Sequence, residues 1–164
     1  MAPRVTVSTP SIYSPRYPVT ALDAGPRAGA AVVALACAVV LIIATMLPPS
    51  PAGVGTHTGL GFQRCEFLDR TGLPCPSCGM TTSFSLFVRG RMLGSFYVQP
   101  MGFVLAVATA ASFWIALYIA VTGRPALRLM RLVPGRYYLI PLMFFGVAAW
   151  GWKIFIHLKG IDGW

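Results

Sequence analysis

Three apolar runs, each about 20 residues long, dominate this sequence. They cover residues 28–47, 100–121 and 137–158, and the third contains the one charged residue among them, Lys153. A helix needs about 20 apolar residues to cross the hydrocarbon core of a bilayer. Each run therefore predicts a membrane-spanning helix. We expect Lys153, which is close to the end of its run, to extend its ammonium group to the interface.

The composition supports a membrane protein. Charged residues make up 10% and hydrophobic residues 56% of the 164 residues, whereas soluble domains carry about 25% charged residues. The net charge of +9 is typical of arginines that flank membrane spans. Nucleic-acid binding would need a basic patch on a polar module, and the sequence shows none. The predicted fold class is an all-α membrane protein in contact with the lipid bilayer, with no nucleic-acid partner.

The chain divides into a tail and one membrane domain. Residues 1–26 contain five prolines, which remove backbone donors and oppose helix formation, so they predict a disordered tail. Residues 27–164 form the membrane domain. Residues 57–91, between the first and second spans, form a cysteine-containing loop followed by a short helix.

The arginines give an orientation. If all three runs cross the membrane, the N-terminal tail and the acid-free loop 124–136, which carries four arginines, share one side. Positive residues near span ends favour the cytoplasmic side. We therefore predict an inner-membrane protein with its cysteine loop on the outer side.

Three of the four cysteines lie close together, at Cys65, Cys75 and Cys78. The last two form a Cys-x-x-Cys motif, and Ser77 is a suitable N-cap for a helix that begins near Cys78. Backbone N–H groups and the dipole at a helix N-terminus stabilise a thiolate. Such a motif serves redox exchange, metal binding or disulfide formation.

A metal site is one interpretation. Structural zinc takes four ligands, usually cysteine or histidine. Cys65, Cys75 and Cys78 supply three, and His57, Glu66 or Asp69 is a candidate for the fourth. A second Cys-x-x-Cys motif is absent, so the pattern indicates cysteines that act together more strongly than it indicates zinc.

Redox work and a purely structural role are the other interpretations. Thioredoxin-type motifs follow a strand in a βαβ unit, and none is predicted here. A membrane oxidoreductase with a quinone partner would not need that sheet, but such enzymes normally use a second thiol pair. Gly79 occupies the position of the histidine needed for haem attachment, so haem is excluded. The structural role is a disulfide or a set of buried thiols that holds the loop.

The segment after Cys78 predicts a short amphipathic helix. Its apolar residues recur at helical spacing, and it is too short to span a membrane. It therefore predicts a helix in the membrane interface, ending at Arg89-Gly90-Arg91. The predicted interface residues are Phe84, Phe87, Arg89 and Arg91.

These motifs resemble the small bacterial membrane proteins of the DUF2752 family. The hallmark of that family, C-x-F-x-x-x-T-G-x-P-C-P-x-C-G-[LM]-T followed by a short helix ending in Arg-Gly, is similar to residues 65–81 and 89–90. Thr82 replaces an arginine and Gln99 an asparagine that are usual in the family. The resemblance implies a multi-pass bacterial membrane protein and no particular activity.

The sequence as a whole predicts a non-catalytic scaffold or partner-binding subunit for another membrane protein. Its cap would be held at Cys65, Cys75 and Cys78 by a metal ion, zinc being the candidate, or by a disulfide. The alternative is a thiol-redox or metal-handling membrane protein that uses Cys75 and Cys78.

Overall fold

The computed structural model describes residues 22–124 and 136–163, with side chains described from residue 139 in the second range. It is helical, and no strand occurs in these two ranges, so the all-α prediction is confirmed. Most of the predicted N-terminal tail and the arginine-rich loop lie outside the described residues. The elements are α1 (Ala24–Met46), the 3-10 helix η1 (Thr56–Leu60), α2 (Glu66–Thr71), α3 (Met80–Val88), α4 (Met92–Val98), α5 (Pro100–Thr122) and α6 (Arg136–Leu158).

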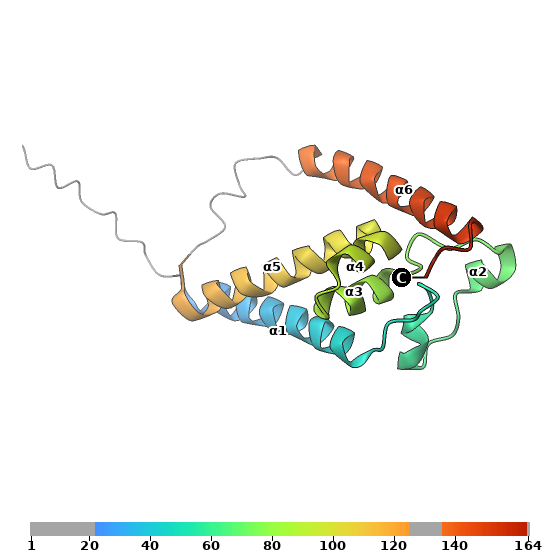
Figure 1. Cartoon of the computed structure of the whole chain (residues 1–164). Coiled ribbons are helices and arrows are strands. Elements are labelled where there is room, and N and C mark those ends of the chain that lie inside the picture. Colours follow the sequence, from blue (N-terminus) through green and yellow to red (C-terminus); the bar gives the residue numbers. More distant parts are fainter. Residues whose placement is uncertain (1–21, 125–135, 164) are drawn as a thin grey trace, which may run out of the picture.

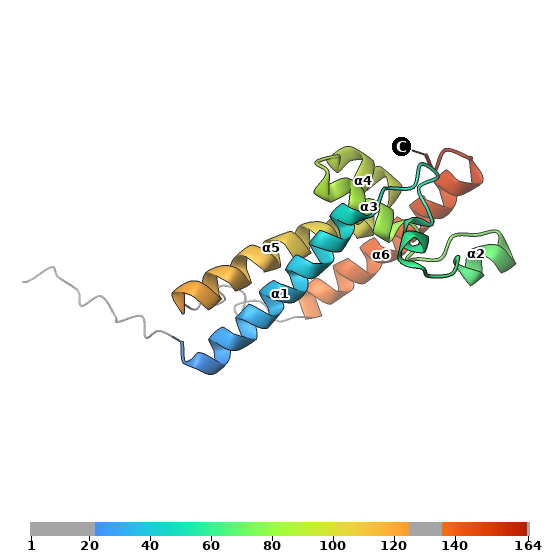
Figure 2. The ribbon, with the colours of Figure 1, turned by 90° about the horizontal axis from the view of Figure 1, so that it is seen from below.

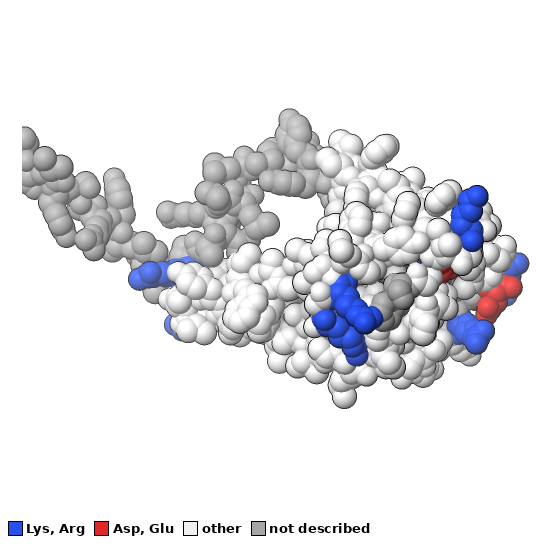
Figure 3. All heavy atoms as spheres, in the orientation of Figure 1, with Lys and Arg blue, Asp and Glu red and all other residues white. Residues whose placement is uncertain are grey.

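Three helices are long and apolar enough to cross a membrane. They are Ala24–Met46, Pro100–Thr122 and Leu139–Leu158, close to the three predicted spans. Large apolar side chains remain exposed along them, as Leu35 and Phe144 show. In Figure 3 the charged atoms gather at the two ends of the α1–α5 pair, with an uncharged surface between them. A hydrocarbon environment accounts for this surface.

Helices α1 and α5 form a long antiparallel pair (Figures 1 and 2). Their buried residues are mostly small, with alanines on both helices, which lets two membrane helices approach closely. The far ends are also tied together. The Leu22 N–H donates to the Gly123 carbonyl at 2.8 Å, and Arg27 Nε donates to the Ala120 carbonyl at 3.2 Å.

The opposite end of this pair carries a cap, which we define as residues 47–99 together with 159–163. Buried hydroxyl groups hold its helices together. Ser83 Oγ of α3 lies 2.8 Å from Ser95 Oγ of α4, which also donates to the Ser83 carbonyl. Helix α5 approaches closely at Gly102, where a Cβ atom would come within 2.9 Å of Ser83 Cβ.

Helix α3 differs from its prediction in its start and in the side chains it buries. It begins at Met80 with Gly79 as its N-cap, rather than near Cys78 with a Ser77 cap. Thr82, Ser83 and Ser85 are fully buried. The polar face of α3 is therefore inside the protein, because hydroxyl partners are available there. Ser85 Oγ, for example, donates to the carbonyl of Leu47 at the end of α1.

The four predicted interface residues lie in or beside α3. Phe84 and Phe87 are partly buried, and the Phe87 ring packs edge-on against Phe103 at 6.0 Å between centroids. Arg91 is the N-cap of α4. Arg89 donates to the carbonyls of Ala44 and Thr45 at 3.2 and 2.9 Å, so its guanidinium caps the C-terminus of α1. Their contact with lipid stays a prediction.

Helix α6 is attached to the cap by side chains of its second half. Trp152 Nε1 donates to the Tyr97 carbonyl at 2.8 Å, and Trp150 Nε1 donates to the Pro74 carbonyl at 2.9 Å. The prediction that Lys153 extends to the interface is wrong. Lys153 is fully buried, and its ammonium donates to the Gly53 carbonyl at 3.3 Å. The loop supplies an acceptor inside the protein, so the side chain turns inward.

Replacing Arg89 tests how much its cap contributes. Arg89→Met keeps the aliphatic stem but leaves the carbonyls at the end of α1 without a cationic donor, so we expect a loss of about 1–2 kcal/mol in stability. The measurement is the thermal unfolding midpoint in detergent. Arg70→Met is the control, because Arg70 makes an exposed ion pair with Glu66 that contributes only about 0.3–0.5 kcal/mol. Equal midpoints for both variants would contradict the assignment.

Candidate functional site

The structure brings the three cysteines of the motif together. Cys65 is the N-cap of α2, whereas Cys75 and Cys78 lie in the loop between α2 and α3. Their three sulfur atoms lie within 4.8 Å of one another. The Cys75 and Cys78 sulfurs are 3.3 Å apart, and all three cysteines are free thiols. Cys65 thus joins two cysteines that lie 10 and 13 positions later in the chain, in agreement with the prediction that the three act together.

Two glycines shape the loop that carries Cys75 and Cys78. Gly72 has a φ of 70° and ends α2 by donating its N–H to the Leu68 carbonyl at 2.8 Å. Gly79 has a φ of 85° and sits directly after Cys78. A Cβ atom at Gly79 would come within 2.8 Å of the Gly53 carbonyl oxygen. Both positions therefore require glycine for conformation, and Gly79 requires it for space as well.

Side chains from distant helices hold the same loop. The Pro74 carbonyl accepts the hydrogen bond from Trp150 described above, and the Pro76 carbonyl accepts one from Gln99 Nε2 at 2.8 Å. Proline has no N–H to offer, so its carbonyl is the only backbone group through which it can be anchored. These bonds fix the peptide unit before Cys75 and the peptide unit between Pro76 and Ser77.

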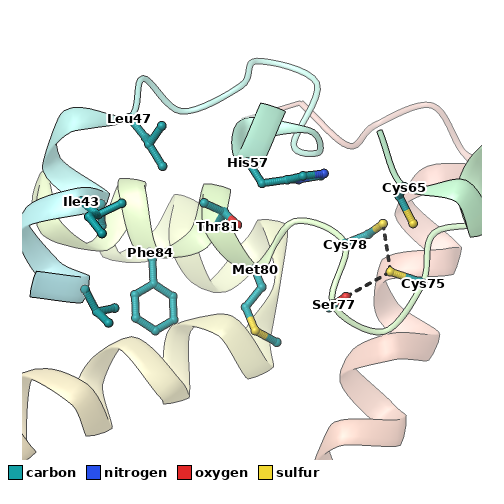
Figure 4. A pocket seen from close by; sticks show the side chains of 12 residues that line it. Ile43, Leu47, His57, Cys65, Cys75, Ser77, Cys78, Met80, Thr81 and Phe84 are labelled. Atoms are coloured by element: carbon teal, nitrogen blue, oxygen red, sulfur yellow. Dashed lines mark hydrogen bonds between the residues drawn. The ribbon is translucent and has the colours of Figure 1, made fainter. Parts of the chain in front are cut away.

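The candidates for a fourth ligand are placed less directly. His57, in η1, is not part of the sulfur cluster, and its Nε2 lies 3.1 Å from the Gln63 carbonyl. Its ring points toward the cysteines in Figure 4. His57 and Asp69 line a cavity of about 290 Å³ together with Cys65 and Cys78. Glu66 is exposed and paired with Arg70.

The two thiols of the Cys-x-x-Cys motif have different acidities. Burial acts to raise the pKa of Cys75, but hydrogen bonds from Ser77, Cys78 and Cys65 outweigh it and lower that pKa to about 7. Burial, reinforced by the neighbouring sulfurs, raises the pKa of Cys78 to about 12. Cys75 is therefore the first thiolate to form, and thiolates are both the nucleophiles and the metal ligands of cysteine chemistry.

A larger cavity of about 530 Å³ adjoins the cluster (Figure 4). One wall comes from the last turns of α1, at Val40, Ile43 and Leu47, and another from Met80 and Phe84 of α3. The cysteines close one end, next to the hydroxyl groups of Ser77 and Thr81. A mostly apolar cavity of this size with a few convergent polar groups is the usual form of a binding site.

Comparison with known families confirms the resemblance seen in the motif. Residues 65–113 match the family model DUF2752, whose description is "protein of unknown function". This region is therefore similar to the DUF2752 family. It contains all three clustered cysteines, helices α2 to α4 and the first part of α5. No curated protein and no solved structure matches the chain.

Three residues that support the cysteine loop were not among the predicted site residues. Trp150 and Lys153 of α6 reach the cap, and Gln99 holds Pro76. The charge of Lys153 inside an apolar run was the available signal, since an ionisable residue within a span marks a functional site by default. Trp150 and Gln99 carry no comparable pattern.

The pKa difference predicts site-selective alkylation in the metal-free protein. Iodoacetamide should modify Cys75 with a rate that rises about fivefold between pH 6 and pH 7 and levels off near pH 8, following the thiolate fraction. Cys78 should stay unmodified up to about pH 9, because its proton is retained. Peptide mass spectrometry assigns the sites, and Cys75→Ser is the control. Faster modification of Cys78 than of Cys75 would refute the assignment.

Proposed function

We propose that this protein is a non-catalytic membrane scaffold whose cap is fastened by one zinc ion bound to Cys65, Cys75 and Cys78. The observation that carries the proposal is the cluster of three thiols within 4.8 Å. Thiolate sulfur is a soft ligand that selects zinc and other thiophilic metals over magnesium or calcium. The sequence context, an uncharged membrane body with few acidic residues, offers little for acid–base catalysis.

The sulfur spacing fits a zinc ion with small side-chain movements. A Zn–S bond of about 2.3 Å in a tetrahedral site places two sulfurs roughly 3.8 Å apart. The three sulfurs lie within 4.8 Å of one another, and the closest pair is at 3.3 Å. His57, which lines both adjoining cavities, is our candidate for the fourth ligand, with water as the alternative.

A metal ion bound here would have a structural role, because it would hold two segments of the cap together. It would join the start of α2 to the loop before α3, and that loop is already bound to α5 and α6 through Gln99 and Trp150. The resulting cap is a rigid platform, which suits docking of another membrane protein. From the arginine distribution we place the cap on the outer side of a bacterial inner membrane.

Metal analysis of the purified protein tests this function. We expect about one zinc ion per chain, with thiols that become reactive only after chelation. Cys65→Ser, Cys75→Ser and Cys78→Ser should each weaken zinc binding by more than about tenfold, because even outer-shell changes cost about that much. Cys37→Ser is the matched control, since Cys37 lies in α1, outside the cluster. Wild-type protein without metal and with freely reactive thiols would refute the proposal.

Thiol-disulfide exchange is the second candidate, and the 3.3 Å separation of the Cys75 and Cys78 sulfurs favours it. A pKa of about 7 at Cys75 is close to that of the thioredoxin nucleophile. The Cys75 thiolate would attack a partner disulfide, forming a mixed disulfide and releasing one partner thiolate. Cys78, after losing its proton to that thiolate, would attack the Cys75 sulfur and release the second. The pair ends oxidised and the partner disulfide ends reduced.

A trapping variant separates this candidate from the zinc scaffold. In Cys78→Ser the second attack cannot occur, so the mixed disulfide on Cys75 should accumulate when the protein is mixed with a disulfide-containing peptide. Non-reducing electrophoresis detects it, and Cys75→Ser is the control that should trap nothing. Absence of the adduct in metal-free Cys78→Ser protein would exclude exchange through this pair.

A further inference from the structure

Lys153 is fully buried, and its side chain lies against the loop that carries Cys78. Transfer of an ammonium group out of water is costly unless the charge is paired and hydrogen-bonded. Lys153 Nζ has three donors, and among the described residues its hydrogen bond goes to the Gly53 carbonyl at 3.3 Å. One neutral acceptor does not compensate for a buried charge, so the position calls for a negative partner.

Asp162 is the acidic residue that acts most strongly on Lys153, and its Oδ1 atom is buried with no hydrogen-bond partner among the described residues. Asp162 and Cys78 are the two groups that interact electrostatically with Lys153. Asp162 Oδ2 is bonded to His157 Nδ1 at 2.5 Å, and no Asp or Glu oxygen of the described residues forms an ion pair with Lys153. Lys153 therefore lies near two sources of negative charge, the Asp162 carboxylate and the sulfur of Cys78.

The lysine side chain also lies next to Gly79, the residue that follows Cys78. Gly79, the next residue, has so little space that a Cβ atom would lie 3.3 Å from Lys153 Cε. The same atom would lie 2.8 Å from the Gly53 oxygen that Lys153 binds. Lys153 thus holds Gly53 and supports the turn that positions the Cys78 sulfur.

We propose that Lys153 is the positioning residue and counter-charge of the three-cysteine metal site; this inference rests on the proposed zinc function. Three thiolates and one divalent ion carry a net charge of −1 when the fourth ligand is neutral. The ammonium of Lys153 would offset this charge inside a low-dielectric cap, where an uncompensated charge is costly.

Charge-removing variants test the inference in the full-length, detergent-purified protein. Lys153→Met keeps the aliphatic stem, Lys153→Gln keeps a donor for Gly53, and Lys153→Arg keeps the charge. Zinc affinity is measured by competition with a chromophoric chelator. We expect Lys153→Met and Lys153→Gln to lose about 10- to 100-fold, the range found when outer-shell partners of metal ligands are removed. Lys153→Arg should retain most of the affinity.

A control and a spectroscopic readout distinguish charge compensation from a general loss of stability. Lys159→Met removes an exposed lysine just beyond α6 and should leave zinc affinity unchanged. Cobalt substituted for zinc should show a weaker sulfur-to-metal charge-transfer band in Lys153→Gln than in wild type, at equal helix content by circular dichroism.

The outcomes separate this inference from the function it rests on. Wild-type protein that binds no zinc would refute the proposed function. Wild-type protein that binds zinc, with equal affinity in folded Lys153→Gln, would refute only the role of Lys153. If Lys153→Met or Lys153→Gln does not fold, retained folding and zinc affinity in Lys153→Arg supports the counter-charge, whereas loss of zinc affinity in folded Lys153→Arg refutes it.

Discussion

Carbonyl groups in the loops of the cap accept hydrogen bonds from side chains of α6 and from Gln99, the N-cap of α5. Trp150 binds Pro74, Gln99 binds Pro76, and Lys153 binds Gly53. Because irregular backbone cannot satisfy its own polar groups, a loop buried against helices needs such partners. Because hydrogen bonds are directional, these three bonds together fix the position of the loops against α5 and α6. The cysteine cluster is the product of that placement rather than of the local sequence alone.

The membrane helices and the closeness of Cys75 and Cys78 could be predicted from the sequence, for physical reasons. A run of about 20 apolar residues has few structural alternatives, and short spacing limits how far Cys75 and Cys78 can separate. Arg89 was predicted to lie in the membrane interface because of its charge. In the structure its guanidinium donates to free carbonyl groups at the C-terminus of α1. A pattern of residue types gives the face of a helix and does not say what covers that face.

Helix α3 shows the same limit. Its hydroxyl-bearing residues form a polar face in the sequence, and a polar face on a short helix near a membrane normally indicates water. In the structure Thr82 Oγ1 lies 2.8 Å from Thr56 Oγ1, and Ser85 donates to Leu47. Hydroxyl groups are small enough to be buried when a backbone carbonyl or another hydroxyl accepts a hydrogen bond from them. Whether the polar face of α3 meets water or protein depends on tertiary contacts, which the pattern of one sequence does not contain.

The sulfur cluster stands between two cavities of different character. Cys65 and Cys78 line both the larger cavity, whose walls are mainly apolar residues of α1 and α3, and the smaller one beside His57 and Asp69. Val40 and Ile43 belong to the larger cavity and are also exposed on the membrane helix α1. The sulfurs therefore border both an apolar space that continues onto a membrane helix and a space lined by charged and polar side chains.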